Sequence, residues 1–171
     1  MSMPTGNFRR IDLDLIEPDF RSVMFDVIAA CNERGFAYHA TRGFDTYGTQ
    51  MALWAKGRTT PGPKVTNAKG GQSAHNFGLA MDFVLDKNQL LPGIQPDWQK
   101  EAYRVLIEEA TARGLHSGQG YDDFPHIGYP GYVTAQDMLP LHLAWEKSQE
   151  LGGDTLTRLK EVWKGVHRKA G

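Results

Sequence analysis

Apolar residues return every three or four positions in several stretches of the chain, which is the period of an amphipathic helix. The longest such run spans residues 15–31 and ends at Gly35. The same period predicts helices over residues 46–56 and 96–113, where Pro96 suits the first turn of a helix. We expect each helix to turn one apolar face toward a common core.

A period of two marks residues 79–85, where four large apolar residues alternate with three others that include Asp82. This alternation predicts a strand with one face in the core and Asp82 on the opposite face. Shorter strands are predicted over residues 36–40 and 126–129. Residues 57–74 are rich in Gly, Pro, Thr and Asn, and we expect a long loop that walls a functional cleft.

The C-terminal part shows two further helical stretches. Thr134 and Asp137 have the spacing of a capping box, and Gly152 and Gly153 separate the first stretch from a second apolar stripe. The polar face of that stripe is mostly basic, with Arg158, Lys160, Lys164, Arg168 and Lys169. A basic amphipathic helix can lie on an anionic surface. The favoured interpretation is that the stripe packs on the rest of the protein and the charges are solvated.

Two short motifs carry the candidate chemistry. The first runs from Ser73 to Asp82 and contains His75, and the second runs from Asp123 to His126. A catalytic zinc site needs three protein ligands, an open position for water and a nearby general base, and the motifs supply such a set. The alternative is that both histidines are hydrogen-bonded core residues and the aspartates pair with arginines. Spacing alone leaves both interpretations open.

The motifs resemble the zinc peptidases of the D-alanyl-D-alanine carboxypeptidase family M15, and within it the L-alanyl-D-glutamate endopeptidases used as phage endolysins. The resemblance rests on Ser73-x-His75-x-x-Gly78-x-Ala80-x-Asp82 and on Asp123-x-Pro125-His126. Upstream, the family order continues in Thr41-Arg42, Gln50, Gly57-Arg58-Thr59 and Val65-Thr66-Asn67-Ala68. The resemblance implies an α+β fold with a small antiparallel sheet and flanking helices, as in Hedgehog and DD-peptidase-like zinc peptidases.

The resemblance also implies a role for each matching residue at the metal. The zinc ligands would be His75, Asp82 and His126, which would hold one Zn²⁺ per chain and leave a fourth position for water. Asp123 would be the general base that activates this water and then the acid that protonates the leaving amine. Asp122 is an alternative base by adjacency, although its favoured interpretation is a solvent-facing turn carboxylate.

Other matching positions imply contacts with the substrate. Arg42 would stabilise the carbonyl oxygen as it becomes an oxyanion, and Gln50 and Ser73 would lie near the substrate and the metal. The chain departs from the family pattern Gly-Leu-x-Trp-Gly, because residues 114–118 read Gly-Leu-His-Ser-Gly. We expect His116 to be a surface loop residue. The alternative is that His116 forms part of the cleft wall, where it would alter substrate preference.

Composition fits one compact enzyme domain. With 171 residues, of which 40% are hydrophobic, the chain can bury a substantial core. A net charge of −1 gives no reason to expect nucleic acid as a partner. Cys31 is the single cysteine, so an intramolecular disulfide is excluded and a buried position is expected. His39, His142 and His167 stand outside the motifs and are predicted to be structural or exposed.

Two expectations about location follow from hydropathy. The sequence holds no apolar stretch of transmembrane length. Residues 1–10 lack the apolar region of a signal peptide. We therefore expect a protein that is made in the host cytoplasm and reaches the cell wall when a phage holin opens the membrane. Separately, we expect it to be a monomer.

The predicted function is hydrolysis of the L-alanyl-D-glutamate bond in the stem peptide of peptidoglycan. A D-alanyl-D-alanine carboxypeptidase or dipeptidase is the alternative within the same chemistry. A non-catalytic wall-binding module is less favoured, because a zinc that only holds the fold would need neither Asp123 nor Arg42. We divide the chain into a catalytic domain, residues 1–133, and a helical extension, residues 134–171, that packs on it.

Overall fold

The computed structural model describes residues 3–166, so His167, Arg168 and Lys169 lie outside the described residues. The α-helices are α1 (Pro18–Glu33), α2 (Tyr47–Ala55), α3 (Arg104–Ala112), α4 (Ala135–Ser148) and α5 (Thr155–Trp163). The strands are β1 (Ala37–Arg42), β2 (Ala80–Asp86), β3 (Pro96–Asp97), β4 (His116–Ser117) and β5 (His126–Gly128). Short 3₁₀ helices are η1 (Thr5–Phe8), η2 (Leu13–Leu15), η3 (Ala74–Phe77), η4 (Lys100–Tyr103), η5 (Gly118–Tyr121) and η6 (Gln149–Leu151).

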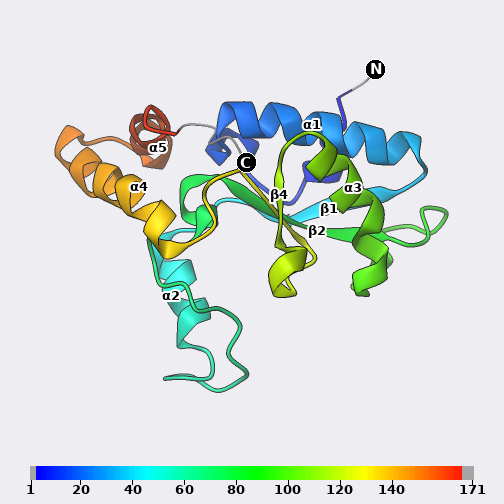
Figure 1. The fold of residues 1–171 in the computed structure, drawn as a ribbon, viewed down its shortest axis with the longest axis horizontal. Coiled ribbons are helices and arrows are strands. Elements are labelled where there is room, and N and C mark those ends of the chain that lie inside the picture. Colours follow the sequence, from blue (N-terminus) through cyan, green and yellow to red (C-terminus); the bar gives the residue numbers. More distant parts are fainter. Residues whose placement is uncertain (1–2, 167–171) are drawn as a thin grey trace.

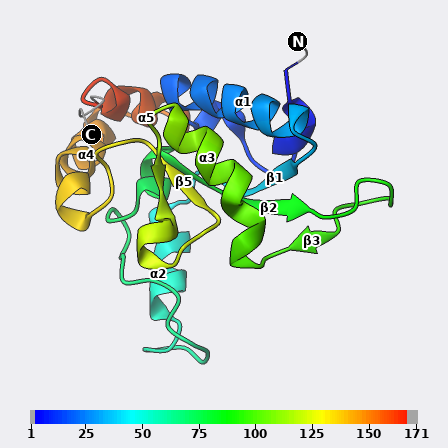
Figure 2. The same cartoon turned by 45° about the vertical axis from the view of Figure 1, so that its right-hand side comes forward.

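The strands form one antiparallel sheet in the order β1-β2-β5-β4, and β3 pairs with the C-terminal end of β2. Helices α1 and α3 lie side by side over one face of this sheet (Figures 1 and 2). Helix α2 and the loop after it project away from the sheet on the other side, and α4 packs against α5. The expected α+β architecture, a small antiparallel sheet with flanking helices, is confirmed.

The hydrophobic core lies between the sheet and the pair of helices α1 and α3. Helix α1 buries one stripe of side chains at helical spacing, consisting of Phe20, Met24, Val27, Ile28 and Cys31. Two buried tyrosines link the sheet to η4. Tyr38 Oη of β1 donates to the Ala102 carbonyl oxygen over 2.6 Å, and Tyr103 Oη of η4 donates to the Phe83 carbonyl oxygen of β2 over 3.0 Å. The expected burial of Cys31 is confirmed.

The helix predicted from Pro96 begins later than its apolar pattern indicates. Pro96 and Asp97 form β3 instead, with Pro96 opposite Asp86 of β2, and α3 begins only at Arg104. Proline cannot donate a backbone hydrogen bond, and its fixed φ suits an edge strand as well as a first helical turn. Pairing with β2, which local spacing does not reveal, decides between the two.

Helix α1 also begins later than its apolar run, at Pro18 rather than Leu15. Glu17 is the N-cap, and its Oε2 accepts the Phe20 N–H over 2.7 Å. Burial raises the pKa of the Glu17 carboxyl above its ordinary value, although bonds from backbone N–H groups oppose the shift. The Glu17 N–H donates to the Gly78 carbonyl oxygen over 2.9 Å, which joins the start of α1 to the end of η3.

The two C-terminal helices contact the sheet-bearing part at defined points. On α4, His142 Nδ1 lies 2.9 Å from the Oη of Tyr47 in α2. On α5, Trp163 Nε1 donates to the Phe77 carbonyl oxygen over 2.7 Å. The capping box at Thr134 is confirmed. The boundary between the two proposed domains stays a prediction.

The apolar stripe of α5 faces the protein: Leu159 and Val162 have no exposed surface, and Leu156 and Trp163 are half-buried. On the polar face, the Arg158 guanidinium stacks over the Trp145 ring at 3.7 Å from its centroid. The stripe therefore packs on the protein. Among the described residues, no helix combines the length and the apolar character needed to cross a membrane.

Gly78 occupies a position where the backbone leaves no room for a side chain. Its φ is +66°, and a Cβ there would lie 2.2 Å from the Leu15 carbonyl oxygen. We expect Gly78→Ala to lower the free energy of unfolding by about 2 kcal/mol or more, because left-handed strain and a clash with rigid backbone add. Chemical denaturation followed by circular dichroism measures the loss.

Gly35→Ala is the matched control for this substitution. Gly35 also has a positive φ, +87°, but a Cβ there would meet nothing within 4 Å. The free energy of unfolding of Gly35→Ala should therefore fall only by the conformational strain, about 1–2 kcal/mol. Equal losses in the two variants would contradict the close packing of η3 against η2.

Candidate active site

The side chains of the two motifs meet at the centre of the sheet. Asp82 of β2 lies opposite Arg42 of β1 on one side and opposite His126 of β5 on the other. Directly paired residues of neighbouring strands place their side chains on the same face of a sheet. The register therefore gathers these three side chains on the face opposite to the core.

A bulge in β1 places Arg42 on that face. Ala40 pairs with Phe83 and Arg42 pairs with Asp82, so Thr41 is an extra residue in the ladder. In an unbroken strand, Arg42 would share the core face with Ala40, because side chains alternate. The extra residue reverses the alternation and turns the guanidinium toward Asp82.

His75 reaches the same place from η3. Ser73 caps this helix, and its Oγ accepts the His75 N–H over 3.3 Å. The ring of His75 is fixed by its Nδ1, which lies 2.8 Å from the Gly43 carbonyl oxygen. Because a carbonyl oxygen only accepts, Nδ1 carries the hydrogen and Nε2 presents a lone pair.

Three possible ligand atoms converge, one each from His75, Asp82 and His126. Asp82 Oδ1 lies 3.2 Å from His75 Nε2 and 3.3 Å from His126 Nδ1. Within the described part of the chain, the buried His75 Nε2 and Asp82 Oδ1 have no hydrogen-bond partner. A lone pair that faces a carboxylate oxygen is repelled by it, and a cation between the two atoms would turn that repulsion into coordination.

The residues present therefore fit a divalent metal ion. The ligand atoms of His75, Asp82 and His126 all lie within 4.8 Å of one another. Burial raises the pKa of Asp82, but the two imidazoles outweigh this effect and hold the pKa well below its ordinary value. The Gly43 carbonyl orients one ligand from behind, as is usual around metal-binding histidines. Three protein ligands leave coordination positions for water or substrate.

Arg42 is held in place by groups on three segments. Its Nε donates to the Asp45 carboxylate, and its Nη2 donates to Gln50 Oε1 over 3.0 Å. Its Nη1 lies 3.5 Å from Asp82 Oδ2. Gln50 Nε2 in turn donates to the Ala68 carbonyl oxygen over 2.8 Å. The guanidinium is thus preorganised beside the three ligand atoms.

Asp123 is the more exposed carboxylate beside this centre. Its Oδ2 lies 3.9 Å from His126 Nδ1, and 48% of its side chain is exposed, against 17% for Asp82. Burial and the negative charge of Asp82 raise the pKa of Asp123, and the neighbouring imidazoles and Arg42 lower it by less. A carboxylate with a raised pKa binds a proton more strongly and is the better general base.

A close backbone approach fixes the turn that carries Asp123 and His126. The Asp123 N–H donates to the Gly118 carbonyl oxygen over 2.9 Å. A Cβ on Gly118 would lie 2.3 Å from the Asp123 carbonyl oxygen and 3.0 Å from the His126 Cβ. This position therefore requires glycine.

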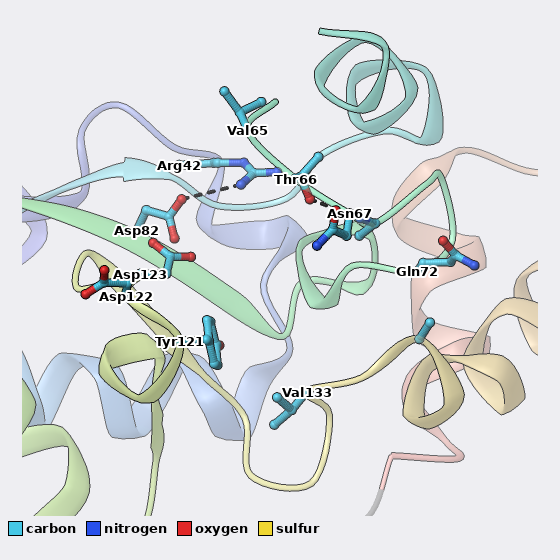
Figure 3. Close-up of a pocket in the computed structure, with 12 residues that line it drawn as sticks. Arg42, Val65, Thr66, Asn67, Gln72, Asp82, Tyr121, Asp122, Asp123 and Val133 are labelled. Carbon is cyan, nitrogen blue, oxygen red and sulfur yellow. Dashed lines mark hydrogen bonds and ion pairs between the residues drawn. The ribbon is translucent and has the colours of Figure 1, made fainter. Parts of the chain in front are cut away.

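A cleft of about 760 Å³ opens over Asp82 and Asp123 (Figure 3). The loop before η3 contributes Val65, Thr66, Asn67, Ala68 and Gln72. The end of η5 with the residue after it contributes Tyr121 and Asp122, and the segment that leads into α4 contributes Val133 and Ala135. Arg42 lies above the two carboxylates in this view, and Tyr121 lies below them. The expectation that residues 57–74 wall the cleft is confirmed.

Arg58 anchors that loop to the end of α2. Its Nη1 donates to the carbonyl oxygens of Trp54 and Thr66 over 2.6 and 3.0 Å. Its Nη2 donates to Asn67 Oδ1 over 3.2 Å, and its guanidinium stacks on the Trp54 ring. A loop with few apolar residues thereby acquires a fixed shape.

Gln50 and Ser73 lie behind the cleft surface. Gln50 is only 1% exposed and connects Arg42 to the loop, while Ser73 caps η3. Neither is among the described residues that line the cleft. Their contact with substrate stays a prediction, and the contacts observed are those of positioning residues.

Asp45 and Asn76 also support the site, although the sequence patterns assign them no role. Asn76 Nδ2 donates to the Asp45 carbonyl oxygen over 2.9 Å, and its Oδ1 accepts the Gly71 N–H over 3.0 Å. Asn76 thereby ties the segment that holds Arg42 to the helix that carries His75. The short spacing between Arg42 and Asp45 was the available signal for their ion pair.

His116 is not the surface loop residue that its polar neighbours indicate. It belongs to β4 and is half-buried against Tyr121 of η5, with ring centroids 5.7 Å apart. Burial, and to a smaller extent His126, lowers the pKa of His116. Burial and the nearby carboxylates of Asp82 and Asp123 raise the pKa of Tyr121 to about 12, so its hydroxyl stays protonated at neutral pH.

The sequence is similar to that of known peptidases. A family model described as VanY, D-alanyl-D-alanine carboxypeptidase, matches residues 14–118. The peptidoglycan L-alanyl-D-glutamate endopeptidase CwlK of Bacillus subtilis (strain 168) is 34% identical over 107 residues, which cover 58% of this chain and 64% of that protein. The chain thus spans just under two thirds of the length of this relative.

A solved structure is also similar, that of the Serratia marcescens L-Ala D-Glu endopeptidase ChiX. It has a TM-score of 0.46 and 18% sequence identity, and the similarity covers 68% of this chain and 81% of that one. The family match includes Arg42, His75 and Asp82 and ends before Asp123 and His126. Because the family model matches more than half of the 171 residues, the chain belongs to the VanY D-alanyl-D-alanine carboxypeptidase family of M15 peptidases.

Proposed function

We propose that the chain is a zinc-dependent endopeptidase that hydrolyses the L-alanyl-D-glutamate bond in the stem peptide of peptidoglycan. The observation that carries this proposal is the convergence of three possible ligand atoms at a cleft that also presents Asp123 and Arg42. Two imidazole nitrogens and one carboxylate oxygen form a donor set that zinc accepts in hydrolases. Membership of a peptidase family supports the same reaction class.

A non-catalytic wall-binding module is less well supported. Structural zinc sites have four protein ligands, whereas the cluster among the described residues has three. A zinc that only held the fold would also have no use for a half-exposed carboxylate with a raised pKa beside it. The arrangement is that of a site which handles protons.

The residues around the cluster divide the chemistry of peptide hydrolysis. A bound zinc ion would polarise the scissile carbonyl and lower the pKa of water. Asp123 would take a proton from the attacking water and pass it to the leaving amine. Arg42 would donate to the carbonyl oxygen as negative charge develops there. Because Asp45 and Gln50 already hold the guanidinium, little reorganisation is needed during the reaction.

The choice of an endopeptidase over a carboxypeptidase rests on the charge of the cleft. A carboxypeptidase must bind the terminal carboxylate of its substrate, which favours a cation besides the arginine at the oxyanion. Arg42 is the single basic residue among the described residues that line the cleft. The relative CwlK is itself named as an L-alanyl-D-glutamate endopeptidase, which supports cleavage within the stem peptide.

Metal removal tests the proposed reaction directly. Purified peptidoglycan incubated with the protein should yield fragments with new N-terminal D-glutamate, as measured by mass spectrometry. A chelator should abolish this cleavage and added zinc should restore it, while His75→Ala should lose both zinc and activity. Release of terminal D-alanine would move the protein to the carboxypeptidase reaction. A folded, zinc-loaded sample that cleaves nothing would favour the wall-binding module.

Asp123→Asn tests the assignment of the general base. We expect zinc binding to persist and kcat to fall by about 10²–10⁴-fold, because the amide cannot accept the proton. Asp122→Asn is the matched control, since Asp122 has a positive φ of 65° that asparagine tolerates well. It should retain most activity. Full activity in Asp123→Asn, or a comparable loss in Asp122→Asn, would overturn the assignment.

We also propose that the protein serves as a phage endolysin, which reaches the cell wall after a holin opens the membrane. The support is the resemblance of its motifs to phage endopeptidases. Expression in a bacterial host should cause lysis only when a holin is expressed with it, measured as a fall in culture turbidity. Lysis without the holin, or intact cells with it, would contradict this role.

A further inference from the structure

The contact between His116 and Tyr121 connects a departure from the family pattern to the cleft. His116 occupies the variable position of the Gly-Leu-x-Trp-Gly segment, and Ser117 stands in place of the tryptophan. His116 Nε2 lies 3.1 Å from Tyr121 Oη, and the two rings stack at 24°. His116 is not among the described residues that line the cleft, whereas Tyr121 is.

Tyr121 stands beside the metal ligands with much of its side chain uncovered. Its ring centroid lies 6.2 Å from that of His126, and the residue is 50% exposed. In Figure 3 its ring lies below the carboxylates of Asp82 and Asp123, on the side opposite Arg42. A peptide bound over these carboxylates would therefore lie between a guanidinium and a phenol.

The segment that carries Tyr121 is fixed by short-range bonds. Ser117 caps η5, and its Oγ accepts the Gln119 N–H over 3.2 Å. The helix ends at Tyr121, and the N–H of its C-cap Asp122 donates to the Gln119 carbonyl oxygen over 3.3 Å. Together with the His116 ring, these bonds hold an exposed aromatic side chain in one orientation, which lowers the entropy cost of a contact with substrate.

The negative charge of Asp82 and Asp123 acts on the Tyr121 hydroxyl and favours one direction for the His116–Tyr121 bond. Asp82 and Asp123 place negative charge above the phenol, which favours the phenolic hydrogen directed into the cleft. His116 then donates from Nε2 to the phenol oxygen. This arrangement leaves Tyr121 with a free donor aimed at the substrate side.

We propose that Tyr121 is a substrate-contacting residue whose hydroxyl donates to a backbone oxygen of the bound stem peptide, on the side opposite Arg42, and that His116 is its positioning residue. The inference rests on the proposed function for the identity of the peptide. Tyr121 and Val133 would together form the lower wall against which the peptide lies. Substrate binding then depends partly on a pair of side chains outside the family's zinc and base motifs.

Kinetics of three variants test the proposal. The substrate is a soluble stem peptide, and zinc content is measured in every sample. Tyr121→Phe keeps the ring and removes the hydroxyl, and we expect kcat/KM to fall by about tenfold or more with zinc affinity unchanged. His116→Phe keeps a stacked ring without the donor and should show a loss in the same direction. His116→Gln restores a donor and should recover part of the activity.

A merely structural role for Tyr121 gives a different result. If the ring only covers His126, Tyr121→Phe will match the unaltered protein, or any loss of activity will follow a loss of zinc. Either outcome overturns the proposal. No recovery in His116→Gln relative to His116→Phe would likewise overturn the role given to His116.

A binding measurement separates this inference from the proposed function. Zinc-loaded Asp123→Asn is titrated with the intact stem peptide by calorimetry, with and without Tyr121→Phe. A weaker Kd in the double variant supports the contact even if the unaltered protein cleaves a different bond. Equal Kd values, or no binding of the peptide at all, overturn it.

Discussion

The register of three strands at Asp82 is the constraint on which the site depends. Its neighbours on either side are Arg42 and His126, and antiparallel pairing places all three side chains on one face. A shift of one residue in either ladder would turn a ligand or the arginine into the core. The packing of α1 and α3 on the opposite face therefore specifies the chemistry as well as the fold, because it fixes which residues of β2 point inward.

Within this frame, the site concentrates opposing charges at short range. A buried carboxylate lies between two imidazoles and a guanidinium, and a second carboxylate remains open to the cleft. Buried polar atoms without partners cost free energy unless an ion satisfies them. The fold tolerates this arrangement because Gly43, Asp45, Gln50 and Asn76 hold the charged groups from behind. The buried His75 Nε2 and Asp82 Oδ1 therefore lower the stability of the fold, as strained groups at functional sites commonly do.

Local patterns predicted most of this architecture. The helical period found α1, α2, α4 and α5, and strict alternation found β2 with Asp82 on its outer face. The family motifs named the three ligand residues, which the fold brings together. The bulge at Thr41 and the strand at Pro96 depend on partners distant in sequence, so spacing did not reveal them. The support from Asp45 and the contact between His116 and Tyr121 likewise arise only when separate turns meet.

The hydrogen bond between Tyr47 and His142 has a consequence for shortening the protein or fusing it to other modules. Helix α4 supplies part of the cleft wall, and it also braces α2, from which Gln50 reaches the arginine of the site. A recombinant fragment cut at residue 133 would retain His75, Asp82, Asp123 and His126 but lose this contact. A fusion partner should therefore be joined beyond Trp163, whose Nε1 donates to the Phe77 carbonyl oxygen at the end of η3.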